Sequence, residues 1–504
     1  MGIVARQSIK ASISNYLGVL IGFATLLYFY PLFFSPKQLG ASRLLVEIGA
    51  VISGFSLLGS TYAVNRFFPY FKNPPLHHGF FFWIFLIPAL GYLLSATGIV
   101  ILEDNFIKLF KKDTSMISTI LPMIVVLVLF MMMQSLFESV AANHGRITIP
   151  NFIREVVVRL LILLFALLFF KKIISFSLFC WLLTGAYLIG ALSSLIYVGR
   201  LTPISLKPDF KFIAEHPEVK SDAIKFTLWF FIVNAVGLVI NKIDFLMISA
   251  SKSLDDTAVY SIGFYLAVLI EIPKRTIMQI SNPIFAEHMK NLNVPKINSL
   301  YKQLANNQLL IGSILFLLIW LNVDTAFHIM PNGQYYKAGK MVVFYIGIGK
   351  LFEMVGITTS PIMSNSKFYA WGLITSLIMI FSAVGLNLWL IPLLGIDGAA
   401  IATVLTFIFG YGFVMLLIYI KMKIHPFTVS QLKTILLLVV FIPLATYLHL
   451  AQNPVIDSLL KTPLLLAILL PCIYYWKISP EFNEQIQKAA HGIRQFRKNR
   501  TTRQ

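Results

Sequence analysis

Apolar stretches of about 20 residues recur along almost the whole chain, and they constrain its fold more than any other feature. A helix that crosses the hydrocarbon core of a bilayer needs about 20 largely apolar residues, because no water is present there to satisfy an open backbone. Short breaks with Pro, Gly and Asn separate the stretches, so we predict an all-α, polytopic membrane protein of about fourteen transmembrane helices. The expected spans are 11–34, 44–67, 79–102, 115–142, 150–170, 174–198, 222–250, 257–286, 302–323, 335–364, 367–391, 396–420, 430–449 and 458–476.

The composition supports this class and excludes others. Of the 504 residues, 58% are hydrophobic and 12% are charged, whereas a soluble domain has about 45–50% and about 25%. The net charge of +20 could suggest nucleic acid, but no polar domain is present to display a basic face. Cys180 and Cys472 lie in separate apolar spans, so we expect no disulfide framework and no metal site.

The distribution of basic residues predicts the topology. An even number of spans places both termini on one side, and that side carries 27 Lys and Arg against 11 on the other. By the positive-inside rule it is cytoplasmic, in the cell (cytoplasmic or inner) membrane. The first apolar stretch exceeds the core of a cleavable signal, so we expect it to remain as the first helix.

Two related halves are indicated. The segments 39–43 and 256–260 look like corresponding breaks in a repeat of six helices, and an even repeat gives both copies the same orientation. We therefore expect six-helix lobes at 1–199 and 223–421, a cytoplasmic linker at 200–222, two additional helices at 422–478 and a basic tail at 479–504. Within the tail, 481–500 has the apolar spacing of a helix on anionic headgroups; a solvated, disordered tail is the alternative.

Ionisable residues inside or at the ends of the spans are the candidates for function, because each is costly in hydrocarbon. Glu155 and Arg159 are four apart and Lys350 and Glu353 are three apart, so each pair can share a helix face and neutralise itself. Long side chains near helix ends can instead reach the headgroups. The full set is Glu47, Arg66, Glu138, Arg154, Glu155, Arg159, Lys242, Asp244, Glu271, Lys274, Arg275, Lys350 and Glu353.

Lys242 and Asp244 are only two apart and point in different directions on a helix, so we expect them to meet different partners. If these groups line a cavity, its many cations favour an anionic ligand, since guanidinium matches the oxygens of phosphate. The candidate headgroup contacts are Arg66, Arg154, Arg159, Lys242, Arg275 and Lys350. Buried carboxylates can load a proton or a sodium ion, and the candidates for ion coupling are Glu47, Asp244, Glu271 and Glu353.

Motifs for catalysis are absent from the sequence. It contains no G-x-x-x-x-G-K-[ST], no H-E-x-x-H and no G-x-S-x-G. We therefore expect neither an enzyme nor a cofactor.

The stretch NLWLIPLLGIDGAAIAT at 387–403 resembles the entry to the twelfth span in the polysaccharide flippases (Wzx-like) of the multidrug/oligosaccharidyl-lipid/polysaccharide exporter superfamily. Supporting motifs are Pro283-Ile284-Phe285-Ala286 before an amphipathic link at 296–302, and Met330-Pro331-Asn332-Gly333 ahead of the tenth span. Where relatives often have Gly-x-Tyr in the second span, this chain has Gly40-Ala41-Ser42, so no functional residue is carried over there.

The resemblance implies two six-helix lobes around a central cavity that opens alternately to each side. It implies a polyprenyl-diphosphate-linked oligosaccharide as cargo, H⁺ or Na⁺ as the coupling ion, and membrane lipids and other polysaccharide-assembly proteins as partners, in surface polysaccharide or lipopolysaccharide biosynthesis. A multidrug cation antiporter of the same superfamily is the first alternative. A membrane polysaccharide polymerase or glycosyltransferase is the second.

Overall fold

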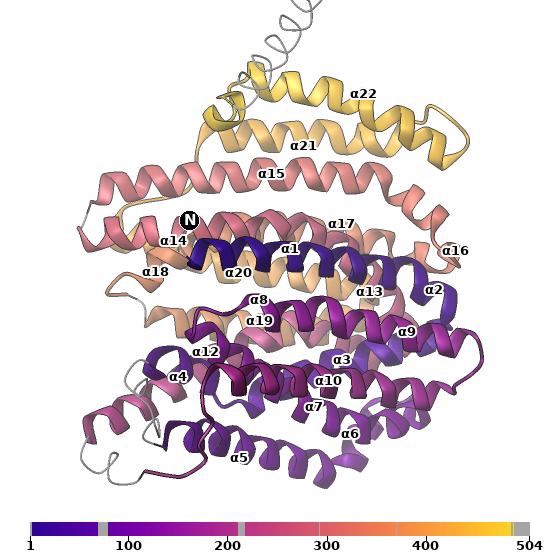
Figure 1. Cartoon of the computed structure of the whole chain (residues 1–504). Coiled ribbons are helices and arrows are strands. Elements are labelled where there is room, and N and C mark those ends of the chain that lie inside the picture. Colours follow the sequence, from indigo (N-terminus) through magenta and orange to yellow (C-terminus); the bar gives the residue numbers. More distant parts are fainter. Residues whose placement is uncertain are drawn as a thin grey trace, which may run out of the picture. The chain divides into compact units, whose positions relative to one another are not determined.

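Every regular element in the described part of the chain is a helix (Figure 1). The computed structural model describes residues 3–68, 79–209, 217–291, 293–368, 370–484 and 487. The elements are α1 (Ile3–Ala24), η1 (Thr25–Phe29), α2 (Tyr30–Phe33), α3 (Pro36–Ser56), α4 (Ser60–Phe67), α5 (Phe80–Ile101), α6 (Glu103–Leu109), α7 (Thr114–Asn143), α8 (Thr148–Phe152), η4 (Ile153–Val157), α9 (Val158–Phe170), α10 (Phe176–Leu201), α12 (Pro217–Ser251), α13 (Leu254–Val268), η5 (Leu269–Glu271), α14 (Ile272–Lys290), α15 (Val294–Ile329), α16 (Gly333–Tyr336), η6 (Lys337–Gly339), α17 (Lys340–Gly356), η7 (Ile357–Thr359), α18 (Ser360–Ser364), α19 (Trp371–Leu394), α20 (Ile396–Met422), α21 (Val429–Tyr447) and α22 (Pro454–Tyr475).

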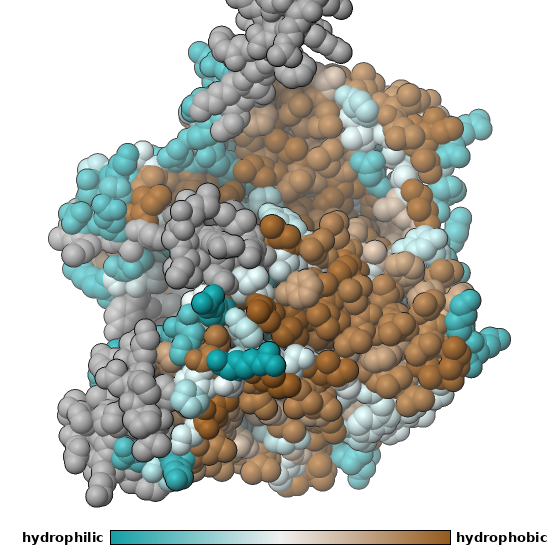
Figure 2. All heavy atoms as spheres, in the orientation of Figure 1, coloured by the Kyte–Doolittle hydropathy of each residue, from teal (hydrophilic) through white to brown (hydrophobic). Residues whose placement is uncertain are grey.

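The helices confirm a multi-pass membrane protein. In the described residues, 12 helices are long and apolar enough to cross a membrane, and each overlaps one of the expected spans. The other two expected ranges, 150–170 and 222–250, are helical as well, as α8–η4–α9 and as α12. On the face drawn in Figure 2, apolar residues cover most of the middle of the helices, and hydrophilic ones gather toward their ends.

The second span begins earlier than the sequence predicts. Pro36 starts α3, and the Ser35 side chain caps it in a capping box with Gln38. Segment 39–43, expected as a break, therefore lies within the first turns of α3, and segment 256–260 likewise lies within α13. At the other end, Gly59 adopts φ 79° between α3 and α4, which a residue with a Cβ rarely tolerates.

The helices form two compact units, and we describe each by itself. The first comprises Met1–Ile262, Met330–Tyr336 and Ala383–Ala399, and the second comprises the remaining helical segments, Gly263–Ile329, Lys337–Ser382 and the chain from Ala400. The expected lobe boundaries therefore stay a prediction. Of the linker, 210–216 lies outside the described residues, as does most of the predicted tail helix at 481–500.

The first unit has an aromatic core where α4, α5, α7 and α10 meet. Phe67, Phe81 and Phe137 are buried there together with Val140 and Val198. Because lipid is as apolar as these side chains, close packing rather than exclusion from water holds such helices together. This core fixes α4 and its Arg66 at one end of the unit.

In the second unit, α21 and α22 pack as a hairpin against α15 (Figure 1). Polar side chains join them along its length, among them Trp320 Nε1, which donates to Thr446 (2.9 Å), and Asn306 Nδ2, which donates to the Ile478 carbonyl (2.8 Å). The segment 422–478, in which two additional helices were expected, is therefore hydrogen-bonded to α15 at more than one point along that helix.

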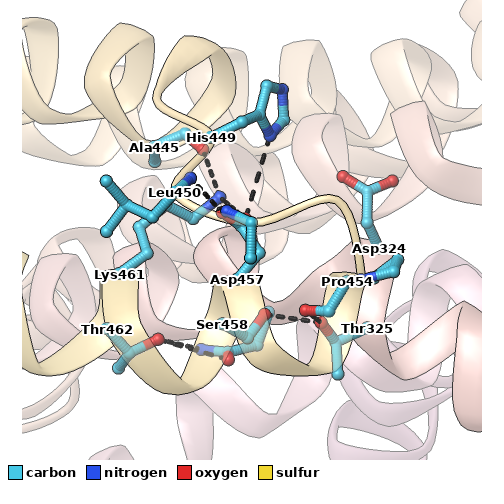
Figure 3. Close-up of polar contacts among 12 residues, drawn as sticks. Asp324, Thr325, Ala445, His449, Leu450, Pro454, Asp457, Ser458, Lys461 and Thr462 are labelled. Carbon is cyan, nitrogen blue, oxygen red and sulfur yellow. Dashed lines mark hydrogen bonds and ion pairs between the residues drawn. The ribbon is translucent and has the colours of Figure 1, made fainter.

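A buried ion pair closes this hairpin. Figure 3 shows Asp457 turned toward Lys461 and toward the backbone of Leu450, whose N–H donates to its Oδ1 at 2.6 Å. Lys461 Nζ lies 3.0 Å from Asp457 Oδ2 and donates to the Ala445 carbonyl at 3.1 Å. One lysine thereby ties α22 to the end of α21.

We expect the substitution Lys461→Met to lower the stability of the protein by about 2 kcal/mol, since a hydrogen bond to a charged group is worth about 1.5–3 kcal/mol. Thermal unfolding of the detergent-solubilised protein measures the loss. Lys296→Met, which removes an exposed lysine of α15, is the matched control. Equal melting temperatures for the two variants would contradict the prediction.

Candidate substrate and coupling site

A seam between α3 and α12, which continues to the first residue of α13, brings together residues that are about 170 to 210 positions apart. Near one end, a Cβ on Gly40 would lie 1.8 Å from the Leu254 carbonyl, and near the other a Cβ on Gly59 would lie 2.5 Å from the Thr227 carbonyl. Between them the Phe55 and Phe231 rings are 6.1 Å apart. The residue numbers fall on one helix as they rise on the other, so the two helices run antiparallel. We call these contacts the α3–α12 seam.

An ion pair lies midway along the α3–α12 seam. Lys242 of α12 pairs with Glu47 of α3, and Arg43, one turn away on the same helix, also binds Glu47. Glu47 is 3% exposed, whereas Lys242 is 28% exposed. One buried carboxylate therefore holds two cations, one from each side of the seam.

The ends of the seam carry further charged contacts. Arg66 is exposed, and its guanidinium stacks over the Phe226 ring of α12 at 4.3 Å. At the other end, buried Asp113 accepts the Leu254 N–H (2.9 Å) at the start of α13 and pairs with Lys37 of α3 (2.6 Å). Asp113 thus joins the first turns of two helices that the sequence assigned to different lobes.

Asp244 faces a different set of partners from Lys242, as their spacing predicts. The Tyr260 hydroxyl donates to Asp244 Oδ2 at 2.7 Å, and Asn387 Nδ2 donates to Oδ1 at 2.9 Å. All three side chains are buried. Asp244 is therefore a buried carboxylate that a hydroxyl and an amide from other segments contact.

A second charged group lies on α7, η4 and α9. Glu155 and Arg159 form the expected pair at 2.7 Å, and Arg159 also donates to the Gly18 carbonyl of α1. Arg154 pairs with Glu138 of α7 and with Glu155 (3.1 Å). The π-helical turn η4 carries Arg154 and Glu155, and such turns interrupt the regular spacing of side chains.

The cations of the first unit are the accessible members of their pairs. Arg154 is 46% and Arg159 is 37% exposed, whereas Glu138 and Glu155 are each 16% exposed. Lys242 is likewise more exposed than its partner Glu47. An anion can therefore approach the nitrogen atoms without first displacing the carboxylates from the interior.

Among the described side chains of the second unit, two lysines and two glutamates form one network. Lys350 Nζ lies 2.9 Å from Glu271 and 2.7 Å from Glu353, and Lys274 pairs with the same two carboxylates. Here the cation is the more buried partner, since Lys350 is 4% exposed. Two lysines and two glutamates neutralise one another, so the network resembles an internal support more than an open anion site.

The structure thus sorts the predicted residues into groups. Arg66, Lys242 and Glu47 meet at the α3–α12 seam, Arg154 and Arg159 meet on η4 and α9, and Lys350, Glu271 and Glu353 meet in the second unit. Asp244 stands apart with Tyr260 and Asn387. The Arg275 side chain lies outside the described residues, and Glu271 pairs with Lys274 and Lys350.

Three residues that take part in these contacts were not among the candidates from the sequence. Arg43 is four residues before Glu47, a spacing that could have found it. Asn387 begins the stretch that resembles the polysaccharide flippases, but no function was assigned to it. No pattern in the sequence marked Asp113 as a candidate. Among the described residues, no group of three or more His, Cys, Asp or Glu could hold a metal ion.

Comparison with solved structures finds proteins that have a similar arrangement of helices. The lipid II flippase MurJ in an inward closed conformation matches with a TM-score of 0.68 and 13% identity, over 92% of this chain and 100% of that one. The chain therefore has the same overall fold as this solved structure. An inward-facing multidrug resistance MATE transporter of the MOP superfamily matches with a TM-score of 0.59 and 13% identity, over 83% of this chain and 98% of its own. A MATE structure in complex with MaL6 matches with a TM-score of 0.54 and 12% identity, over 84% and 96%.

No family model matches the sequence, and no curated protein matches it either. The likeness therefore concerns the fold. It leaves both the role of the chain and its cargo to be argued from the residues.

Proposed function

We propose that the protein is a flippase that moves a polyprenyl-diphosphate-linked oligosaccharide across the cytoplasmic membrane by alternating access, with both termini cytoplasmic. The likeness to MurJ carries this proposal, because it extends over 92% of the chain against 83% for the MATE transporter. A cargo with a charged headgroup and a long apolar tail needs polar contacts inside the membrane while its tail stays in lipid.

The accessible cations of the first unit support an anionic headgroup. Arg154, Arg159 and Lys242 each present more surface than the carboxylates that hold them. A diphosphate can share these nitrogen atoms, because a guanidinium has five donors and a carboxylate uses only part of them. In this proposal Lys350 supports the second unit, and Arg66 and Arg275 remain candidate contacts.

The coupling ion is proposed to act at Asp244. This carboxylate is buried and receives hydrogen bonds from a hydroxyl and an amide, whereas Glu47, Glu271 and Glu353 are each bound to lysine. A buried carboxylate that receives hydrogen bonds from a hydroxyl and an amide can take up or release a proton or a sodium ion.

Purified protein in liposomes provides the test. The rate at which a fluorescent polyprenyl-diphosphate sugar becomes accessible to an impermeant quencher measures flipping. The double variant Arg154→Gln/Arg159→Gln should flip at least about tenfold more slowly, since a hydrogen bond to a charged group is worth about 1.5–3 kcal/mol.

The matched control is Lys111→Gln/Lys112→Gln, which removes two exposed charges from the turn before α7. Equal rates for the two double variants would refute the headgroup site. Transport of a cationic dye in place of the lipid would establish the multidrug alternative, and extension of the glycan without movement would establish an enzyme.

A further inference from the structure

Two glycines of α1 lie against the charged group on α7, η4 and α9. They form the pattern Gly18-x-x-x-Gly22 within the first apolar span, and α1 packs along α8, η4 and α9 in the first unit (Figure 1). We propose that these two glycines form a socket that holds the Arg159 guanidinium in the orientation that binds the diphosphate of the cargo. This inference rests on the proposed function and makes both glycines positioning residues, which act through Arg159.

Each glycine of the socket faces one member of the Glu155–Arg159 ion pair. A Cβ on Gly18 would lie 2.7 Å from the Glu155 Cβ and 2.7 Å from its carbonyl oxygen, and a Cβ on Gly22 would lie 2.5 Å from Arg159 Nη1. The residue numbers rise together, so α1 runs parallel to η4 and α9 here. Small residues four apart let membrane helices approach closely, and in this chain the space that they leave is filled by an ion pair.

The lack of a side chain at Gly22 uncovers the carbonyl of Gly18. In a helix the Cα–Cβ bond tilts toward the N-terminus, so a side chain covers the turn before its own residue. A side chain at position 22 would therefore lie over the Gly18 carbonyl, which accepts a hydrogen bond from Arg159 Nη1. The three atoms nearest to a Cβ at Gly22 all belong to the Arg159 side chain. Gly22 thus makes room for the guanidinium and for its hydrogen bond.

The socket fixes the direction in which Arg159 presents its exposed surface. Arg159 Nη2 pairs with Glu155 at 2.7 Å while Nη1 binds the Gly18 carbonyl, so the planar guanidinium is held at two of its nitrogen atoms. The side chain is still 37% exposed, and a guanidinium has five N–H donors. A ligand that binds an already oriented side chain avoids the entropy cost of ordering it. The diphosphate would therefore meet an ordered donor beside Arg154, which pairs with the same Glu155.

Binding of farnesyl diphosphate to the full chain in nanodiscs tests the socket. Gly22→Ala should lower the affinity about fivefold, the size expected when one long side chain has to be ordered on binding. The added methyl group displaces the end of a flexible side chain, so the protein should unfold at the temperature of the unaltered one. Gly185→Ala in α10 is the matched control, because a Cβ there meets no atom within 4 Å. Farnesol is the uncharged control ligand.

A double-mutant cycle separates positioning from packing. Arg159→Lys keeps the positive charge but replaces the fork of the guanidinium by a single ammonium group, and it should also lower the affinity about fivefold. Adding Gly22→Ala to Arg159→Lys should then lower the affinity by less than about twofold, because the group that alanine displaces is gone. If Gly22 served packing alone, alanine would lower the affinity by the same factor in both backgrounds.

The outcomes distinguish this inference from the proposed function. If farnesyl diphosphate does not bind the unaltered protein, the diphosphate cargo fails and the socket has no ligand to position. If it binds and Arg154→Gln/Arg159→Gln weakens it, but Gly22→Ala binds like Gly185→Ala, the proposed function stands and the socket is refuted. If Gly22→Ala does not fold, Arg159→Lys decides: binding as tight as that of the unaltered protein would show that charge alone suffices and would overturn the inference.

Discussion

Replacement of Lys350 by methionine should destabilise the protein by about 3–5 kcal/mol, the cost typical of removing one partner from a buried ion pair. The Lys350 ammonium lies between Glu271 and Glu353 at 2.9 and 2.7 Å and is almost fully buried. Without it, Lys274 alone faces two carboxylates, and the second unit carries an uncompensated negative charge inside the membrane. Unfolding of the purified protein in nanodiscs measures the effect.

Restoring neutrality should recover most of this loss. The double variant Lys350→Met/Glu353→Gln leaves one lysine and one glutamate, so the remaining pair is balanced again. Lys421→Met, at the exposed end of α20, is the control for loss of a lysine. If the double variant is no more stable than Lys350→Met, charge balance is not what the network provides.

Alanine at Gly40 should stop the α3–α12 seam from closing and should slow transport about a hundredfold. The added Cβ would lie 1.8 Å from the Leu254 carbonyl, which is backbone and cannot rotate away. A penalty of about 3 kcal/mol, at the upper end of the usual cost of overpacking, corresponds to that factor in the closed population. The flipping assay in liposomes measures the rate.

Gly98→Ala is the control for this substitution, because a Cβ at Gly98 of α5 meets no atom within 4 Å. The Gly40→Ala protein should still fold, since only the approach of two helix ends is affected. Transport at the rate of the control would show that the ends of α3 and α13 do not need to touch.

Much of the fold could be predicted because hydrophobicity is a local property. Apolar stretches of spanning length occur where the helices are, and proline or glycine marks the breaks. The start of α3 was predicted too late because Pro36 and the segment 39–43 were interpreted as a break between spans. In the structure Pro36 begins the helix, and Lys37 and Arg43 pair with Asp113 and Glu47.

The site could be predicted only in part, for a related reason. Pairs one helical turn apart, such as Glu155 with Arg159 and Lys350 with Glu353, follow from spacing, and both form. Lys274 with Glu353 and Lys242 with Glu47 join different helices, so their pairing depends on how the helices pack. No spacing within a single helix contains that information.

By itself, the sequence determined that this chain is a bundle of membrane-crossing helices and which charged residues had to find partners there. These conclusions follow from the cost of placing polar groups in hydrocarbon, a cost that each segment incurs alone. Only the tertiary structure decided that Glu47 holds cations from both α3 and α12, and that Lys350 is enclosed while Arg154 stays accessible. Burial and ion pairing between distant helices depend on the packing of all the neighbours at once, so they emerge only when the helices are assembled.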